Sequence, residues 1–168
     1  MSSTAKDRRQ KQLAVVGAIG HEHFMTGVRM LYACRYQDAL KHFQEAAILE
    51  PLCRGYLSYL GLATAHAHRK YSDAEQLCRR AIEAEYMRPE HYFNLAEVYH
   101  LAGRKADAIK NYNQSLSWNP SFEPALDALR KLGMRRQPVL TALPRSHPIN
   151  VFLGKTLRKK ARQVQLAR

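Results

Sequence analysis

Residues of matching size return about every 34 positions through the middle of this 168-residue chain. The spacings between equivalent positions are 34 or 35 residues, and the dipeptide Asp-Ala recurs at 38–39, 73–74 and 107–108. The other recurring positions are Gly27, Gly61 and Ala96, and then Phe43, Cys78 and Tyr112. Because self-similarity at a fixed period of this length indicates stacked structural repeats, the spacing restricts the chain to a repeat architecture.

The residue types at these positions fit repeats made of paired helices. Small residues allow two helix axes to approach closely, whereas bulky side chains would hold them apart. Pro51, Pro89 and Pro120 stop helices or start them, and Gly103 interrupts the chain between two of them. We therefore predict helices over residues 21–33, 37–49, 54–68, 72–85, 89–102 and 105–118, followed by a capping helix over 121–132 that Ser121 starts and Gly133 ends.

These marks resemble the tetratricopeptide repeat. The third copy matches best, through Tyr92, Leu95, Ala96, Tyr99, Ala108, Tyr112 and Pro120. The second copy departs from the pattern, because one residue is inserted near 68–71 and Tyr86 replaces the closing proline. The resemblance implies an all-α, right-handed solenoid of three helical hairpins at about 20–53, 54–88 and 89–122, with a capping helix up to 133. Residues 1–19 are then a basic segment with a short helix, and 134–168 a basic tail containing prolines.

Charge is distributed very unevenly. The net charge is +3 over residues 1–12, −1 over 13–127 and +11 over 128–168, which together give the formal +13 of the chain. Any affinity for an anionic partner is therefore expected in the tail. On a helix, tail residues 149–164 would carry an apolar stripe flanked by cations, and three interpretations stay open: docking on the capping helix, binding to an anionic membrane, or contact with nucleic-acid phosphates. The cations concerned are Lys155, Arg158, Lys159, Lys160 and Arg162.

The sequence offers no pattern typical of an enzyme or of a cofactor site. The three cysteines form no C-x-x-C pair, the histidine pairs at 21/23 and 66/68 point to different faces of a helix, and neither a glycine-rich phosphate loop nor G-x-S-x-G occurs. We therefore expect no catalytic residue, no metal and no cofactor. No apolar run is long enough to span a bilayer and no signal-peptide cleavage pattern follows the N-terminal apolar run, so we expect a cytoplasmic protein.

In tetratricopeptide proteins the first helices of successive repeats line a concave groove that binds peptides or helices. Carried over by position, the resemblance implies an apolar groove with an acidic edge. Its expected residues are Phe24, Val28, Leu31, Tyr32, Leu62, His66, Phe93, Glu97 and His100, with Ser58, Ala65 and Glu90 at further groove positions. One branch of the family grips terminal carboxylates, but here the matching positions hold Phe24, Val28, Tyr59, Glu90 and Asn94, so that function is not expected. The alternative is that Phe24, Leu31 and Phe93 only pack against their own chain.

Three functions compete at this point. The leading hypothesis is a non-enzymatic interaction module or scaffold that binds a peptide or helix of a protein partner in the groove. The second is a cytosolic chaperone for a secreted or assembly-prone client, because the layout is also similar to that of the translocator chaperones of type III secretion. The third is a tether to nucleic acid or anionic membrane through the basic tail.

Overall fold

The computed structural model describes residues 3–133, 148–149 and 152. Residues 3–133 form seven helices and no strand. The chain divides into two units, Met1–Leu129 and Arg130–Arg168, and the repeats belong to the first. Nearly all of the basic tail, including Lys155, Arg158, Lys159, Lys160 and Arg162, lies outside the described residues, so every expectation about it stays a prediction. None of the described helices combines the length and the apolar character needed to cross a membrane.

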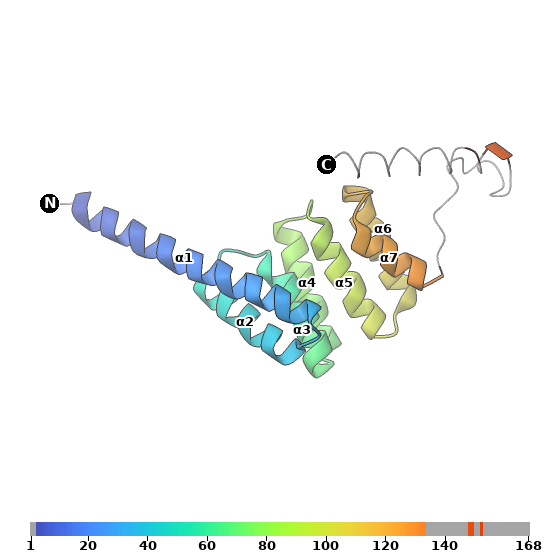
Figure 1. Cartoon of the computed structure of the whole chain (residues 1–168), viewed down its shortest axis with the longest axis horizontal. Coiled ribbons are helices and arrows are strands. Elements are labelled where there is room, and N and C mark those ends of the chain that lie inside the picture. The colour runs from blue at the N-terminus through green and yellow to red at the C-terminus, as the bar shows by residue number, and fades with distance from the viewer. Residues whose placement is uncertain (1–2, 134–147, 150–151, 153–168) are drawn as a thin grey trace. The chain divides into compact units, whose positions relative to one another are not determined.

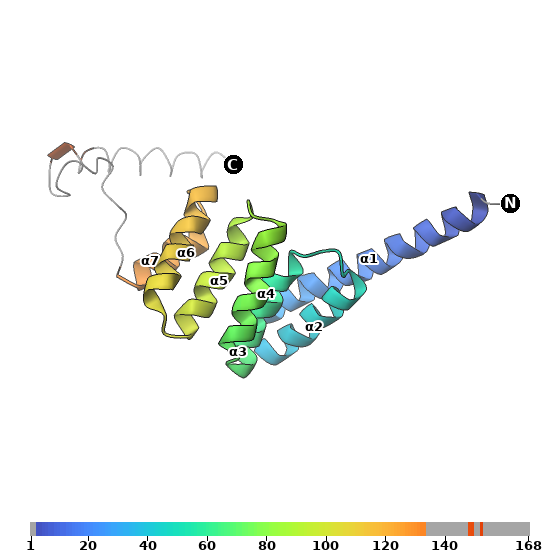
Figure 2. The same ribbon diagram turned by 180° about the vertical axis from the view of Figure 1, so that it is seen from behind.

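The helices pair into three hairpins in chain order (Figures 1 and 2). The second helix of each hairpin packs against the first helix of the next one. The bounds are α1 Ser3–Tyr32, α2 Tyr36–Leu49, α3 Tyr56–His68, α4 Tyr71–Ala84, α5 Pro89–Leu101, α6 Lys105–Trp118 and α7 Glu123–Lys131. The predicted solenoid of three helical hairpins is confirmed, and the ends of α2 to α6 lie within two residues of the predicted ends.

The recurring small residues lie where two helices touch. Ala39, Ala74 and Ala108 are all fully buried, and so are the three larger residues one turn further along the second helices, Phe43, Cys78 and Tyr112. The first helices have Gly27, Gly61 and Ala96 at the matching positions, each of them buried. A side chain on Gly61 would place its Cβ atom 2.7 Å from the carbonyl oxygen of Ala74. The 34-residue period therefore marks the closest helix contacts in each hairpin.

The acidic residue of each Asp-Ala dipeptide lies in the first turn of a second helix. A carboxylate there is stabilised by the positive end of the helix dipole. In two of the repeats the carboxylate also pairs with an arginine just before the helix. Arg35 lies 2.7 Å from Asp38, and Arg104 lies 2.7 Å from Asp107. The dipeptide thus fixes the start of the second helix with one residue and its packing with the next.

The N-terminal region differs from the prediction. A short helix before residue 20 and a separate helix over 21–33 were expected, whereas α1 is continuous over 30 residues. No proline interrupts this stretch, and the three glycines within it face a neighbouring side chain instead of a turn. Gly20 lies against Glu50, whose carboxylate would meet a Cβ atom there at 2.7 Å. A glycine that makes room for a contact is compatible with an uninterrupted helix.

The capping helix is shorter than predicted. α7 begins at Glu123, and Ser121 does not cap it, because the hydroxyl of Ser121 donates a hydrogen bond to Oδ1 of Asn119. Leu126 and Leu129 are buried, as expected for the inward face of a cap.

Candidate functional site

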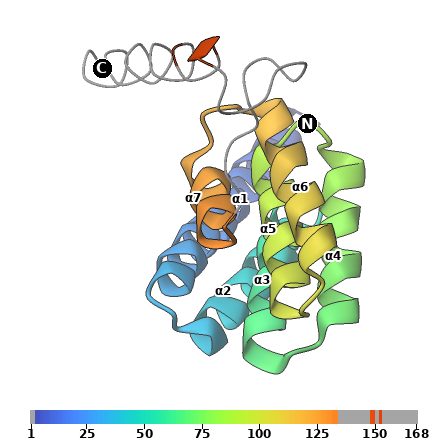
Figure 3. The ribbon, with the colours of Figure 1, turned by 90° about the vertical axis from the view of Figure 1, so that its right-hand side faces the viewer.

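The first helices of the three repeats are neighbours. α3 contacts α5 closely and also contacts α1, and Figure 3 shows α3 beside α5. We call the surface they share the first-helix face. It is defined by all the expected groove residues, Glu90 included, together with Tyr59. All of these residues lie on α1, α3 and α5, but they differ in how far solvent reaches them.

On α1, aromatic packing holds the predicted residues in place. The Phe24 ring stacks on that of Tyr56, with centroids 4.5 Å apart, and meets the Tyr59 ring edge-on at 5.0 Å. Phe24, Val28 and Leu31 are half-buried and pack against the cluster around Phe43. Tyr32, by contrast, is 80% exposed. Each half-buried residue therefore packs against the fold on one side and faces solvent on the other.

On α3, the predicted positions are mostly covered. Leu62 is only 5% exposed, and Ser58 and Ala65 are buried. The reason is that α3 has neighbours on both sides, so its groove positions meet α1 or α5 before they can meet a partner. Tyr59, which the groove positions passed over, is the half-buried aromatic residue of this helix. In the sequence, Tyr59 could have been identified as the aromatic residue that directly follows the groove position Ser58.

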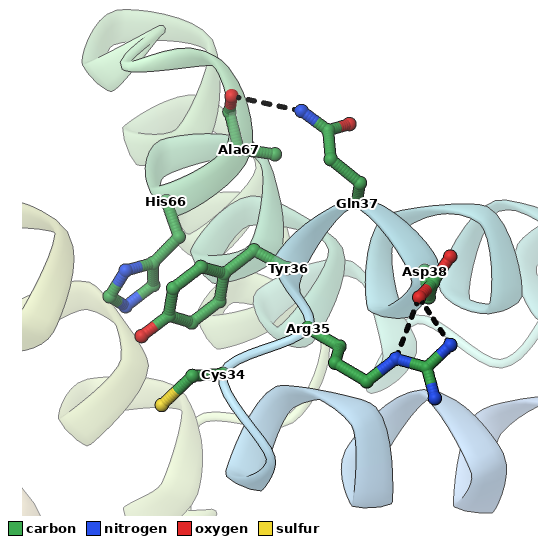
Figure 4. Close-up of a pocket in the computed structure, with 7 residues that line it drawn as sticks. All are labelled: Cys34, Arg35, Tyr36, Gln37, Asp38, His66 and Ala67. Atoms are coloured by element: carbon green, nitrogen blue, oxygen red, sulfur yellow. Dashed lines mark hydrogen bonds and ion pairs between the residues drawn. The ribbon is translucent and has the colours of Figure 1, made fainter.

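His66 lies at the end of α3 and is the one predicted residue there that stays partly accessible. Its imidazole ring stacks on the phenol of Tyr36 with centroids 4.0 Å apart and planes 6° from parallel. The two rings border a depression of about 330 Å³ whose other lining residues come from the α1–α2 turn and the ends of the two helices around it (Figure 4): Cys34, Arg35, Gln37, Asp38 and Ala67. Burial lowers the pKa of His66, against the opposing effect of Glu97, so the ring is neutral near pH 7.

On α5, Phe93 is half-buried and meets the Phe122 ring edge-on at 5.7 Å. The carboxylate of Glu97 accepts a hydrogen bond from the hydroxyl of the buried Tyr112. His100, one turn further along, is exposed. Phe93, Glu97 and His100 follow one another at intervals of four and three residues, about one turn each, and therefore share one side of α5.

Glu90, at the start of α5, is the second acidic residue of the face. Its Oε2 atom is buried and has no hydrogen-bond partner among the described residues. Its charge also contributes, after burial, to raising the pKa of Tyr59 to about 12. Arg88 is the cation whose charge acts on Tyr59 in the opposite sense, and it pairs with Glu85 at 3.2 Å.

A buried polar cluster lies behind the face. The hydroxyl of Ser58 is 2.8 Å from Nδ1 of His91 and accepts a hydrogen bond from the side-chain amide of Asn94 at 3.1 Å. Glu85 lies 3.8 Å from the other ring nitrogen of His91. A serine, a histidine and a carboxylate linked one to the next in space suggest nucleophilic catalysis. Ser58 is completely buried, however, so no substrate reaches its hydroxyl, and the cluster joins α3 to α5 instead.

Among the described residues, no three histidine, cysteine or acidic side chains come together in a way that could hold a metal ion.

The comparisons with known proteins agree with this architecture. The family model of the tetratricopeptide repeat matches residues 25–84 and 64–120. No curated protein matches the sequence. The first tetratricopeptide domain of human RPAP3 is similar with a TM-score of 0.59 at 17% identity, over 70% of this chain and 91% of that one.

Two similar structures contain bound peptides. The second domain of human RPAP3, in complex with the HSP70 peptide SGPTIEEVD, has a TM-score of 0.52 at 16% identity, over 69% of this chain and 99% of that one. The type III secretion chaperone SycD of Yersinia enterocolitica, in complex with a peptide of the translocator YopD, has a TM-score of 0.50 at 18% identity, over 67% and 84%. At these identities the similarity shows the fold alone.

Proposed function

Because the chain belongs to the tetratricopeptide repeat family, we propose that it is a non-enzymatic interaction module whose first-helix face binds a peptide or helix of a protein partner. The observation that carries the proposal is the set of aromatic rings on this face that keep one side open to solvent, Phe24, Tyr59, Phe93 and the 80% exposed Tyr32. A few anchor residues, often tyrosine or tryptophan, supply most of the binding energy of protein interfaces. Proteins of similar fold bind partner peptides, including the HSP70 peptide and the YopD peptide.

The partner differs in chemistry from the acidic peptide bound to human RPAP3. That peptide ends in two glutamates, a valine and an aspartate. Here Asn94, the one uncharged polar residue at the positions that would grip a carboxylate, is 2% exposed and donates to Ser58. Glu90 has the sign that repels an acidic peptide. These two residues support the expectation that the chain is no carboxylate-binding member of the family.

The chaperone hypothesis and the tether through the basic tail stay predictions. The chaperone hypothesis draws on the fold similarity to SycD. The tether depends on residues outside the described part of the chain. The two hypotheses require different parts of the chain. A chaperone would use the first-helix face to bind one client, whereas a tether needs residues 134–168.

Affinity purification with the wild-type chain, two substitution variants and a deletion variant tests the proposal. The face variant carries Tyr32→Ala and Phe93→Ala, and the matched control carries Ile48→Ala and Leu52→Ala, which remove apolar side chains that are 70% and 90% exposed elsewhere. We expect the wild-type chain and the control to retain the same partner and the face variant to lose it. Loss from the control with retention by the face variant would contradict the proposal. Loss on deletion of residues 134–168 alone would assign binding to the tail.

A further inference from the structure

We propose that the N-terminal part of α1 pairs, in antiparallel orientation, with the same part of a second copy of this chain. The segment concerned is residues 3–20 of α1, which we call the α1 arm. It contains none of the residues that define the first-helix face, so the inference does not depend on the proposed function.

The α1 arm extends beyond the hairpin that α1 forms with α2 (Figures 1 and 2). α1 has 30 residues, whereas α2 has 14. Glu50, directly after α2, lies within 4 Å of the Cβ positions of both Gly17 and Gly20. Residues 3–16 therefore continue past the end of α2, over about 21 Å at 1.5 Å per residue. Every side chain that the structure describes within these residues is exposed.

A helical stretch of this length needs a surface to pack against. Isolated helices shorter than about 12–15 residues are only marginally stable in water, because most helix stability in proteins comes from packing of an apolar face. The residue types do not supply the missing stability, since Val15, Val16 and Ile19 are β-branched and Gly17 is a poor helix former. An uninterrupted helix over residues 3–16 thus indicates that another molecule covers the arm.

The arm presents the apolar side chains that such packing requires. Leu13, Val15, Val16 and Ile19 are 64%, 60%, 36% and 42% exposed. On a helix these four positions occupy adjoining sectors, so they form one apolar stripe about two turns long. An exposed apolar stripe of this kind marks a surface that binds a protein.

The order of charges along α1 favours a second arm as the occupant. Residues 6–11, at the tip of the arm, have four basic residues and one acidic one, whereas residues 13–20 have no charged side chain. The base of the arm is acidic. Glu22 lies there on α1, and α2 adds Glu45 and Glu50, because His42 of α2 hydrogen-bonds to His23 of α1. Neither residues 13–28 nor residues 42–53 include a lysine or an arginine.

Antiparallel pairing makes this order self-complementary. With a two-fold axis between positions 16 and 17, each apolar stripe faces the stripe of the other copy, and positions 8–11 come opposite positions 22–25. The basic tip of each arm then lies beside the acidic base of the other. Parallel pairing would instead place two basic tips together. The chain's own tail is a poor occupant, since the net charge of +11 over residues 128–168 repels the tip.

Sedimentation equilibrium of the full chain tests the inference. We expect the weight-average mass to rise from 19.3 kDa towards twice that value as the concentration increases from about 1 to about 200 µM. The arm variant carries Val15→Gln and Ile19→Gln, and glutamine is the better helix former, so it removes the apolar stripe without weakening the helix. We expect its dissociation constant to rise at least about tenfold. The matched control, Ile48→Gln with Met87→Gln, replaces side chains that are 70% and 60% exposed outside the arm and should associate like the wild type.

Charge reversal tests the orientation of the two arms. The base variant carries Glu22→Lys and Glu45→Lys, and the tip variant carries Arg8→Glu and Lys11→Glu. Each variant alone brings like charges together, so we expect both to stay monomeric at concentrations where the wild-type chain dimerises. An equimolar mixture pairs opposite charges at both ends and should restore the dimer. A mixture that associates no more than its components would contradict the antiparallel arrangement.

A wild-type chain that stays monomeric at about 200 µM, or an arm variant that associates as tightly as the wild type, overturns the inference. Loss of association in the Tyr32→Ala, Phe93→Ala variant, or on deletion of residues 134–168, also overturns it, because the arm would then bind the first-helix face or the tail. We expect the arm variant to retain the partner in the affinity purification described above. Each proposal can therefore fail while the other stands.

Discussion

Replacing Gly61 by alanine tests whether close helix approach is the physical meaning of the 34-residue period. A Cβ atom at Gly61 would lie 2.7 Å from the carbonyl oxygen of Ala74, 2.9 Å from Sγ of Cys78 and 3.3 Å from Cβ of Leu77. The first of these neighbours is backbone, so α3 and α4 must move apart by several tenths of an ångström. Overpacking of this kind costs about 1–3 kcal/mol.

A second effect has the opposite sign. Alanine in a helix interior is more favourable than glycine by about 1 kcal/mol. The net expectation for Gly61→Ala is a loss of about 1 kcal/mol in the free energy of unfolding. Gly17→Ala in α1 is the matched control, because its Cβ atom would meet nothing nearer than a Glu50 oxygen at 3.8 Å. There the helix-propensity gain acts alone, and we expect stabilisation of up to about 1 kcal/mol.

The assay is urea unfolding of the full chain followed by circular dichroism at the helical minimum, with wild type and both variants compared at the transition midpoint. The two substitutions are chemically identical, so their opposite signs would isolate the effect of packing. The reasoning is refuted if Gly61→Ala is as stable as the wild-type chain or more so, since α3 and α4 would then not need a glycine to approach each other.

Three further outcomes follow from the buried polar and sulfur groups. Tyr112→Phe removes the hydroxyl that donates to Glu97, and we expect it to lower the free energy of unfolding by about 1.5–3 kcal/mol in the same urea assay. Burial raises the pKa of the Cys78 thiol, so in the native protein iodoacetamide should modify the exposed Cys34 but spare Cys78 until urea is added, as peptide mass spectrometry would show. Burial lowers the pKa of His91 below 6.5, so the unfolded chain binds more protons as the pH falls below that value. Stability should therefore decrease from about pH 6.5 downwards, and His91→Gln should flatten this part of the profile.

The sequence allowed the prediction of the places where two helices approach each other closely. Fully buried alanines were expected where Ala39, Ala74 and Ala108 lie, because only a small side chain fits between two close helices. The continuous α1 was missed because a glycine reads equally well as a turn or as room for a neighbouring side chain. Only the contact between Gly20 and Glu50 distinguishes the two.

The turns within the hairpins hold a regularity that the residue types conceal. Cys34, Arg69 and Gly103 occupy equivalent positions 35 and 34 residues apart, and all three have positive φ angles of 58°, 57° and 75°. Only one of the three residues, Gly103, is a glycine, the residue type that adopts a positive φ angle without strain. The sequence of the third repeat alone therefore indicates this turn conformation. Aligning the repeats on Gly103 would have revealed that the other two residues accept the same left-handed conformation, although it is strained for side chains with a Cβ atom.

The candidate site was predicted less well because periodicity tells which residues share a helix face but not how many neighbours that helix has. The same groove position is half-buried at Leu31, buried at Ala65 and exposed at His100. α3 is the middle first helix, and α1 and α5 cover its sides, so Ser58 faces His91 and Asn94 where a partner was expected. If the proposed function holds, we therefore expect partner contacts on this face mainly in the first and third repeats, with Tyr59 and His66 as the contribution of the second repeat.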